Sequence, residues 1–466
     1  MSDPLDPYLY SWPYSELHGD SRWRDAGPLF SERLLPETAA ELEQDSRWPL
    51  FFPASICVVT TTDGEAVAME KVVGPSIVNR FPYILALSFC IKRLSDRHHV
   101  RNFFTKTLEN GAGVAVQFFP PGKILDRAMA SILEVDEKLS RERVAQTGMS
   151  TRKALTNDSP VFDSAYMVYE ARLARPGKDF HGRTILEKPW IDLGSHRVYF
   201  FEINALQLDE RIANGEKQIA WRSLPRWLPK TEKKIIPKPK IGPESFSKYI
   251  KGYTPHYRFP SHGTIAFESD GSEHSMAIKY LPPLPENQVE VDNDRARWPC
   301  FFPSAAGMIT AYTEDGVPNL MPCGSTTIVS RHPLIVAIAL SNASINERYT
   351  PRASLKMIVE SGKFGCGVPF IDEKVVNAIR YAGNVSFKSD PKKIYNSGLE
   401  FIETTSNTPV LADLPLHMDC EVIDQSHLGT HTLFFGEVKR ALVRKDVTPS
   451  NPLKWIPWAD VVAGEQ

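Results

Sequence analysis

The feature that most constrains the fold of this 466-residue chain is an internal repeat. The segment SRWPLFFP at residues 46–53 returns as ARWPCFFP at residues 296–303. A second pair, LGSHRVYFFEI at 193–203 and LGTHTLFFGEV at 428–438, stands near the end of each copy. Because single hydrophobic cores stop growing near roughly 250–300 residues, a repeat of this length predicts one β-rich domain present twice.

The two copies share an order of predicted elements. Each contains a β-branched strand, an Asp-Gly turn, an apolar strand and a short helix that ends before a glycine. The corresponding segments are residues 56–61 and 308–311, 63–64 and 315–316, 83–87 and 334–340, and 100–108 and 353–359. Short strands outnumber helical windows and no βαβ alternation is visible, so we expect a mainly β fold with some α, as two antiparallel barrel-like domains.

The repeat also sets the expected domain boundaries. We expect a leader at residues 1–44, a first domain at 45–228, a linker with a second leader at 229–294, and a second domain at 295–466. The linker opens with a lysine- and proline-rich stretch at 229–240, which predicts an extended, solvated segment. No aromatic residues interleave its lysines, which argues against a nucleic-acid-binding patch.

The charge and cysteine content exclude several classes of function. With 54 basic and 56 acidic residues the formal net charge is -2, so no overall field favours nucleic acid or an anionic membrane. The N-terminus has neither the basic nor the apolar region of a signal peptide, and no apolar run is long enough to span a membrane. The six cysteines form no C-x-x-C pair. We therefore expect a cytoplasmic, soluble protein without a metal site.

Five short blocks in the second copy stand in a characteristic order. They are GNVS at 383–386, SGL at 397–399, PVL at 409–411, DCEV at 419–422 and GTHTLFFGEV at 429–438. This order resembles the flavin reductase-like family, the FMN-binding split barrels, and the resemblance covers nearly all of the second copy and most of the first. It implies two split β-barrel domains that bind FMN in a groove between them and transfer hydride from NADH or NADPH to the flavin.

The phosphate of FMN is dianionic near neutral pH and needs hydroxyls, N–H groups and an arginine at one point. The resemblance implies that the second copy supplies these groups from three segments, namely Gly324, Ser325, Thr326 and Thr327, then Ser341 and Asn342, then Arg348 and Thr350. Taken alone, residues 325–327 would be strand hydroxyls facing solvent and Arg348 a surface arginine. The first copy aligns Gly74-Pro75-Ser76 with residues 325–327, so we expect its flavin site to be altered.

A histidine occupies the same place in both copies, at His196 and His431. A lone histidine in an apolar strand is more often structural than catalytic. Its presence in both copies and the resemblance imply a place close to flavin and nicotinamide, where it donates to the reduced flavin or orients the hydride donor. The family commonly has an acidic residue just before this histidine, whereas this chain has Ser195 and Thr430.

The duplication and the resemblance together predict the function. One chain containing both copies is expected to form an intramolecular pseudo-dimer, which could pair again as a homo-oligomer. We expect an FMN-dependent oxidoreductase of the flavin reductase type with a small-molecule substrate. Two alternatives stay open, because a fold does not fix a function. One is a flavin-dependent oxidase or oxygenase-like enzyme acting on a small organic substrate between the barrels, and the other is a non-catalytic flavin-binding or scaffold protein.

Overall fold

The computed structural model divides the chain into two compact units, one built around Ala54–Leu224 and the other around Pro303–Gln466. Each unit contains one large antiparallel sheet. The residues that the structure describes are 23–35, 56–79, 82–91, 102–119, 144–178, 182–209, 264–269, 272–280, 307–342, 351–369, 372–402, 404 and 406–447.

The first unit is a ten-stranded sheet whose main path runs β15-β16-β14-β10-β7-β3-β4. The long strand β14 pairs with β6 and β13 at its start and with β10 and β16 towards its end, so the sheet curls around it. The bounds are β3 Ile56–Thr62, β4 Val67–Val73, β5 Ser76–Asn79, β6 Ile84–Cys90, β7 Val114–Phe118, β10 Met167–Leu173, β13 Trp190–Leu193, β14 His196–Asp209, β15 Thr264–Ser269 and β16 Ser272–Tyr280. Two small ribbons, β8 Thr151–Lys153 with β9 Pro160–Phe162 and β11 Gly177–Lys178 with β12 Thr184–Ile185, and helix α2 Asn102–Glu109 complete the unit.

The second unit is a nine-stranded sheet whose main path runs β1-β2-β25-β24-β21-β17-β18, with β20 beside β25 and β19 beside β20. Three helices and one small ribbon accompany it. The bounds are β1 Arg24–Ala26, β2 Phe30–Leu34, β17 Gly307–Tyr312, β18 Pro318–Cys323, β19 Thr326–Arg331, β20 Leu334–Ser341, α8 Ala353–Ser361, β21 Lys363–Val368, α9 Glu373–Asn384, α10 Lys393–Asn396, β22 Phe401–Ile402, β23 Val410–Leu411, β24 Leu416–His427 and β25 His431–Arg444.

The two sheets have corresponding strand orders. Strands β25, β24, β21, β17 and β18 of the second unit stand in the same sequence as β14, β10, β7, β3 and β4 of the first. The shorter ladders also correspond, because β19–β20 and β5–β6 each contain one register shift, after Ile328 and after Ile77. These matches agree with the two copies of one domain that the repeated sequence predicts.

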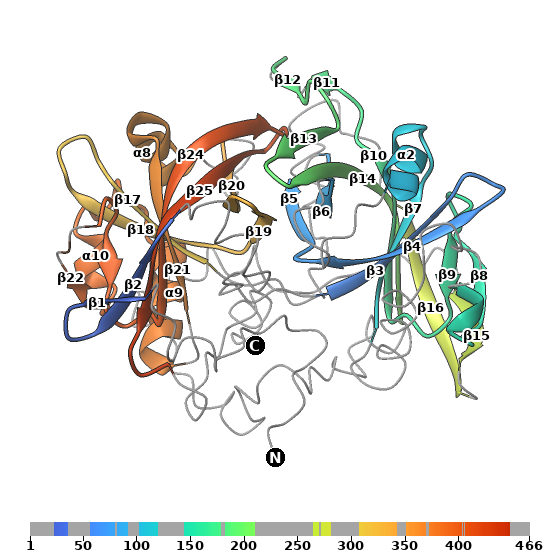
Figure 1. Ribbon diagram of the computed structural model, residues 1–466, viewed down its shortest axis with the longest axis horizontal. Helices are drawn as coiled ribbons and strands as arrows, with labels where there is room; N and C mark the ends of the chain where they lie inside the picture. Colours follow the sequence, from blue (N-terminus) through green and yellow to red (C-terminus); the bar gives the residue numbers. More distant parts are fainter. Residues whose placement is uncertain are drawn as a thin grey trace. The chain divides into compact units, whose positions relative to one another are not determined.

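Each sheet is extended at one edge by a two-stranded hairpin. In the sequence, this hairpin stands just before the strands of the other unit. The hairpin β1–β2 comes before the strands of the first unit, yet β2 pairs with β25 of the second unit from Phe30 opposite Arg444 to Leu34 opposite Arg440. The hairpin β15–β16 comes before the strands of the second unit, yet β16 pairs with β14 of the first. In Figure 1 the blue β1–β2 hairpin accordingly lies beside the orange and red strands of the second unit. The two units therefore exchange their leading hairpins.

Glycines close the predicted turns and one predicted helix. Gly64 and Gly316 have positive φ angles of 97° and 77° in the β3–β4 and β17–β18 turns, which confirms the two Asp-Gly turns. Gly362, with φ of 66°, ends α8 in the left-handed conformation, and its N–H donates to Ile358 O at 2.8 Å. Residues with a side chain would be strained at these positions.

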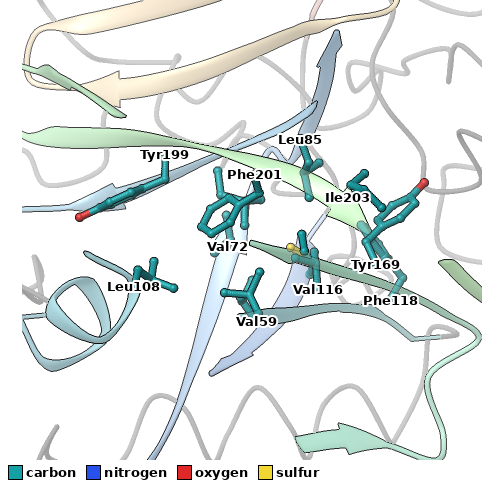
Figure 2. Packing of buried hydrophobic residues seen from close by; sticks show 14 of the residues in the cluster. Val59, Val72, Leu85, Leu108, Val116, Phe118, Tyr169, Tyr199, Phe201 and Ile203 are labelled. Atoms are coloured by element: carbon teal, nitrogen blue, oxygen red, sulfur yellow. The ribbon is translucent and has the colours of Figure 1, made fainter. Parts of the chain in front are cut away.

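The larger hydrophobic cluster of the first unit lies on one face of its curled sheet, and a smaller one that includes Val58 and Val168 lies on the other. Figure 2 shows β-branched and aromatic side chains from several strands meeting in the larger cluster, among them Val59, Val116, Tyr169 and Phe201. Leu108 of α2 packs against the same cluster, which explains why the helix is amphipathic. Burying each such side chain contributes roughly 1.5–3 kcal/mol, so this cluster is a major source of the unit's stability.

Candidate functional site

The candidate site of the second unit forms where β20 ends and β25 begins. Ser341, the last residue of β20, lies directly opposite His431, the first residue of β25. The backbone N–H of Asn342 donates to Thr430 O at 3.0 Å, which fixes the chain just beyond the ladder. Three of the residues predicted from the sequence, Ser341, Asn342 and His431, therefore come together at one end of one strand pair.

Two polar atoms at this point are buried. Within the described ranges, the Ser341 Oγ and the Asn342 Oδ1 have no hydrogen-bond partner. The amide nitrogen of Asn342 is used, because it donates to His427 Nδ1 and to Thr432 Oγ1, both at 2.8 Å. A buried polar atom without a partner is costly unless a ligand satisfies it. A hydroxyl and an amide oxygen can form hydrogen bonds with the hydroxyl groups of a ribityl chain, so these residues are chemically suited to binding FMN.

The histidine is oriented by the residue before it. Thr430 Oγ1 lies 2.7 Å from His431 Nδ1, and Ser195 Oγ lies 2.7 Å from His196 Nδ1. When the hydroxyl donates, the neutral ring carries its proton on Nε2. A hydroxyl in this position fixes the ring without adding the negative charge that the family's acidic residue would bring. Both histidines follow a tight turn, in which Gly194 and Gly429 have positive φ angles.

The predicted phosphate segment lies between β18 and β19. Gly324 and Ser325 form the turn, and the N–H of Ala339 donates to Ser325 O at 3.1 Å. Thr326 and Thr327 are each only 3% exposed, so the reading of these two hydroxyls as solvent-facing is wrong. The Thr326 hydroxyl donates to Cys323 O at 3.0 Å, which makes it a residue that holds the turn.

Two predicted phosphate ligands, Arg348 and Thr350, lie outside the described residues. The chain is described again just before α8, where the N–H of Arg352 donates to Ser341 O at 3.0 Å. The start of α8 therefore reaches the end of β20. Arg352 is a cation at this corner that was not predicted from the sequence, because one basic residue before a helix carries no distinctive signal.

The first unit has a different set of groups at the corresponding place. Cys90 lies opposite His196 in the β6–β14 ladder, where the second unit has Ser341 opposite His431. In the β5–β6 ladder Ser76 pairs with Ala86, and at the equivalent position of the β19–β20 ladder Thr327 pairs with Ala337. Ser76 therefore corresponds to Thr327. It follows that Gly74 and Pro75 correspond to Ser325 and Thr326. The first unit thus keeps the histidine and its hydroxyl partner but has fewer hydroxyls around them.

A second polar cluster in each unit is structural. His417 is 1% exposed, and its Nε2 lies 2.9 Å from Thr408 Oγ1 and 3.2 Å from Asp419 Oδ1. Burial alone would raise the pKa of Asp419, but hydrogen bonds from His417, Ser406 and Thr408 and the charge of His417 hold this pKa below its usual value. These contacts fasten a loop to the sheet.

The corresponding acid of the first unit is Glu170, which is fully buried. It accepts hydrogen bonds from the N–H groups of Leu155 and Thr156 at 2.9 and 2.6 Å. Neither cluster was predicted from the sequence, since the acids alternate with apolar residues inside strands.

Neither a metal-binding cluster nor a membrane-spanning helix is found in the part of the chain that the structure describes. No group of three or more His, Cys, Asp or Glu side chains there could hold a metal ion. None of the helices described is both long and apolar enough to cross a membrane.

A known domain family matches one part of the chain. Residues 299–457 match the model of the flavin reductase like domain, so this part of the chain is a flavin reductase like domain. The predicted resemblance and the predicted mainly β, flavin reductase-like fold class are thereby confirmed. The match supports the coarse, flavin-related form of the predicted function for residues 299–457.

Curated relatives match over shorter stretches. An uncharacterized protein of Aeropyrum pernix is 32% identical over 108 residues, covering 23% of this chain and 37% of that protein. An uncharacterized protein of Pyrococcus abyssi is 26% identical over 121 residues, covering 26% of this chain and 63% of that protein. The matches thus span about a third and somewhat under two thirds of these relatives.

Solved structures are also similar to this chain. Flavoredoxin from Methanosarcina acetivorans is 21% identical, with coverage of 34% of this chain and 78% of that chain and a TM-score of 0.29. Nitrilotriacetate monooxygenase component B from Bacillus cereus is 20% identical, with coverage of 37% and 86% and a TM-score of 0.30. An FMN-binding protein from Thermus thermophilus is 16% identical, with coverage of 32% and 75% and a TM-score of 0.27.

Proposed function

We propose that this protein is an FMN-dependent oxidoreductase of the flavin reductase type, which uses NADH or NADPH as donor. One observation carries the proposal. Inside the flavin reductase like domain, the Ser341 Oγ and Asn342 Oδ1 are buried and lack a hydrogen-bond partner among the described residues, and they lie beside a histidine whose ring contacts Thr430. This combination of hydroxyl, amide and oriented imidazole suits a ligand with many hydroxyls and a ring that changes its protonation.

The roles of the residues follow from their positions. FMN supplies the hydride-accepting chemistry when it is bound. Ser341 and Asn342 would bind the ribityl hydroxyls and so fix the depth at which the cofactor sits. His431 would donate a hydrogen bond from Nε2, since its Nδ1 is occupied by Thr430. A pre-oriented donor costs no rearrangement during the reaction.

The pairing of the two units is a separate part of the proposal. The corresponding strand orders support two copies of one domain in the chain. The intramolecular pseudo-dimer, a further homo-oligomer and a small-molecule substrate stay predictions. We expect one flavin per chain, held by the second unit, because the first unit has Cys90, Gly74 and Pro75 at the corresponding positions.

Flavin titration and donor oxidation test this function directly. The full chain is reconstituted with FMN, desalted, and its flavin content is measured by absorbance and by quenching of flavin fluorescence. Oxidation of NADH and of NADPH is then followed with FMN as the sole acceptor. A flavin content near zero would sink the proposal. Tight FMN binding without donor oxidation would point to the flavin-binding or scaffold alternative, and donor oxidation that requires an organic substrate would point to the oxygenase-like one.

A further inference from the structure

The side-chain amide of Asn342 is held by two residues of the β24–β25 hairpin. Its nitrogen donates to His427 Nδ1 and to Thr432 Oγ1, both at 2.8 Å. His427 is the last residue of β24 and lies directly opposite Thr432 in the ladder. Asn342 follows β20, which pairs with the other side of β25. Both hydrogen atoms of the amide nitrogen are therefore used by one cross-strand pair.

These two contacts fix the orientation of the amide. An amide nitrogen can only donate, so Nδ1 of His427 is the acceptor. A histidine that accepts at Nδ1 is neutral and carries its proton on Nε2. The Oδ1 atom, on the other branch of the amide, is buried and has no hydrogen-bond partner within the described ranges. Asn342 therefore offers an acceptor, and not a donor, to a ligand at this point.

The first unit has an apolar residue where the second unit has Asn342. The N–H of Ile91 donates to Ser195 O at 2.9 Å, just as the N–H of Asn342 donates to Thr430 O at 3.0 Å. Ile91 thus occupies the corresponding place after its strand. Its side chain has no polar atom, so the first unit offers no amide at this corner.

The residues that hold the amide also differ in the first unit. Arg197 corresponds to Thr432, because each follows the repeated histidine. Asp192 lies opposite Arg197 as His427 lies opposite Thr432, and Arg197 Nη2 donates to Asp192 Oδ2 at 2.8 Å. An ion pair therefore completes the same hairpin position without orienting an amide. Since this corner forms in the first unit without the network, the network serves the site rather than the fold.

We propose that His427 is a positioning residue, which holds Asn342 as a hydrogen-bond acceptor for a hydroxyl or N–H group of the ligand. His427 acts through Asn342, and Thr432 supplies the second anchor. The inference rests on the proposed function, because it concerns the ligand that binds beside Ser341 and His431. An amide held in advance does not have to be ordered when the ligand arrives, which favours binding.

Protonation of His427 would reverse the amide. Histidine ordinarily takes up a proton as the pH falls through about 6.5. A protonated ring donates from both nitrogens, so its Nδ1 no longer accepts from the amide nitrogen of Asn342. Half a turn of the amide restores the contact, with Oδ1 facing His427 and the nitrogen facing the ligand. Affinity for a ligand that donates to Asn342 is therefore highest when His427 is neutral and falls as the pH decreases.

Other ionisable residues stand on the elements around His427. Asp424 lies on the same strand, His431 begins β25, Arg352 directly precedes α8, and β20 has no ionisable side chain. An exposed carboxylate and a guanidinium ordinarily keep their charges between about pH 5.5 and 8. His431 is a histidine like His427 and titrates in the same range. A variant that keeps His431 and replaces only His427 therefore separates the two.

Two substitutions of His427 test the proposal. H427N keeps an acceptor near the position of Nδ1 that does not titrate, whereas H427A removes the acceptor. The Kd of FMN is measured for the full chain at pH 8 and pH 5.5 by quenching of flavin fluorescence. At pH 8 we expect H427N to stay within about twofold of wild type and H427A to bind about fivefold more weakly, as for the loss of one hydrogen bond. At pH 5.5 wild type should bind about fivefold more weakly than H427N. The phosphate of FMN titrates alike with each protein and cancels in this comparison.

Failure of the inference and failure of the proposed function give different results. If the wild-type chain binds no FMN at either pH, the proposed function fails. If it binds FMN but H427A matches wild type at pH 8, or H427N follows the wild-type pH profile, the positioning role of His427 is overturned.

The second anchor gives an independent pair of variants. T432V removes the hydroxyl that accepts from Asn342 and should weaken FMN about fivefold at both pH values, whereas T432S keeps the hydroxyl and should match wild type. Equal affinities of T432V and T432S would overturn the orientation of the amide. Thermal unfolding without FMN checks that H427N and T432S fold like the wild-type chain, so that their affinities report on the site.

Discussion

Ser341 and His431 lie directly opposite each other across the β20–β25 ladder, so a hydroxyl and an imidazole share one edge of the candidate site. The pairing brings together residues that are far apart in the sequence through the register of two strands. A change at either residue should therefore affect the same bound ligand.

His431 should contribute directly to turnover. Replacing it by glutamine, as H431Q, removes an imidazole donor and should lower kcat for NAD(P)H oxidation by about 10²-fold, the usual range for a positioned proton donor. Steady-state kinetics with saturating FMN measure this effect. H196Q is the matched control, because the first unit is expected to carry an altered site. Equal losses in both variants would show that the two histidines contribute alike.

The hydroxyl that orients His431 should matter less than the ring itself. Thr430 is fully buried, and T430V keeps its shape while removing the contact to Nδ1 at 2.7 Å. The loss of one hydrogen bond should cost about 1 kcal/mol of stability, and the freed ring should lower kcat about tenfold. A matching S195A variant should leave kcat unchanged. If T430V retained full activity, the hydroxyl would have no part in orienting the ring.

Acid stability should depend on Asp419. Its pKa is lower in the folded protein than in the unfolded chain, so its ionised form contributes stability above the unfolded value of 3.8, and this contribution is lost as pH falls through the folded pKa. D419N should reduce the free energy of unfolding at pH 7 by about 1–3 kcal/mol, because buried donors lose a charged acceptor. Urea unfolding at pH 7 and below pH 4 measures the difference, which should shrink in acid. A constant difference across this range would contradict the assignment.

Much of this fold was predictable from local pattern. The Asp-Gly turns and the strands beside them were correct because alternation, β-branching and positive-φ glycines act over a few residues. The contact between Ser341 and His431 could also be predicted, since each residue stands at one end of a strand that the sequence predicts.

The hairpin exchange and the burial of Lys393 in α10 were not predictable in this way. Strand β2 pairs with β25 across more than half the chain, and no local pattern records a partner so distant. The dipeptide Lys392-Lys393 suggests two solvated charges, yet only Lys392 is exposed. Burial of the second lysine depends on how α10 packs, which tertiary structure decides.

The core of the second unit should depend on a residue from the N-terminal hairpin. Phe30 of β2 is 2% exposed and packs with Val410 and Leu442. F30A should destabilise the second unit by about 3–5 kcal/mol, as expected when a buried phenylalanine is truncated. L29A is the matched control, because the neighbouring Leu29 is 42% exposed. Differential scanning calorimetry would measure the shift, and equal effects of the two variants would show that β2 is not docked as described.

The exchanged hairpins should also hold the two halves of the chain together after cleavage. A protease site placed within residues 229–240 would leave β1–β2 on the N-terminal fragment and β15–β16 on the C-terminal fragment. Each fragment then carries a hairpin that pairs in the other unit, so we expect the fragments to co-elute in native size-exclusion chromatography and to separate only in denaturant.

The variant F30D shows whether the hairpins are responsible. A charge at Phe30 would be buried against Val410 and Leu442, so it should release β2 from β25 and weaken the association of the cleaved fragments. Uncleaved F30D controls for loss of folding by circular dichroism. Separation of the wild-type fragments in native buffer would contradict the exchange. Association that F30D leaves unchanged would mean that some other contact joins the fragments, because the β2–β25 pairing would then contribute nothing measurable.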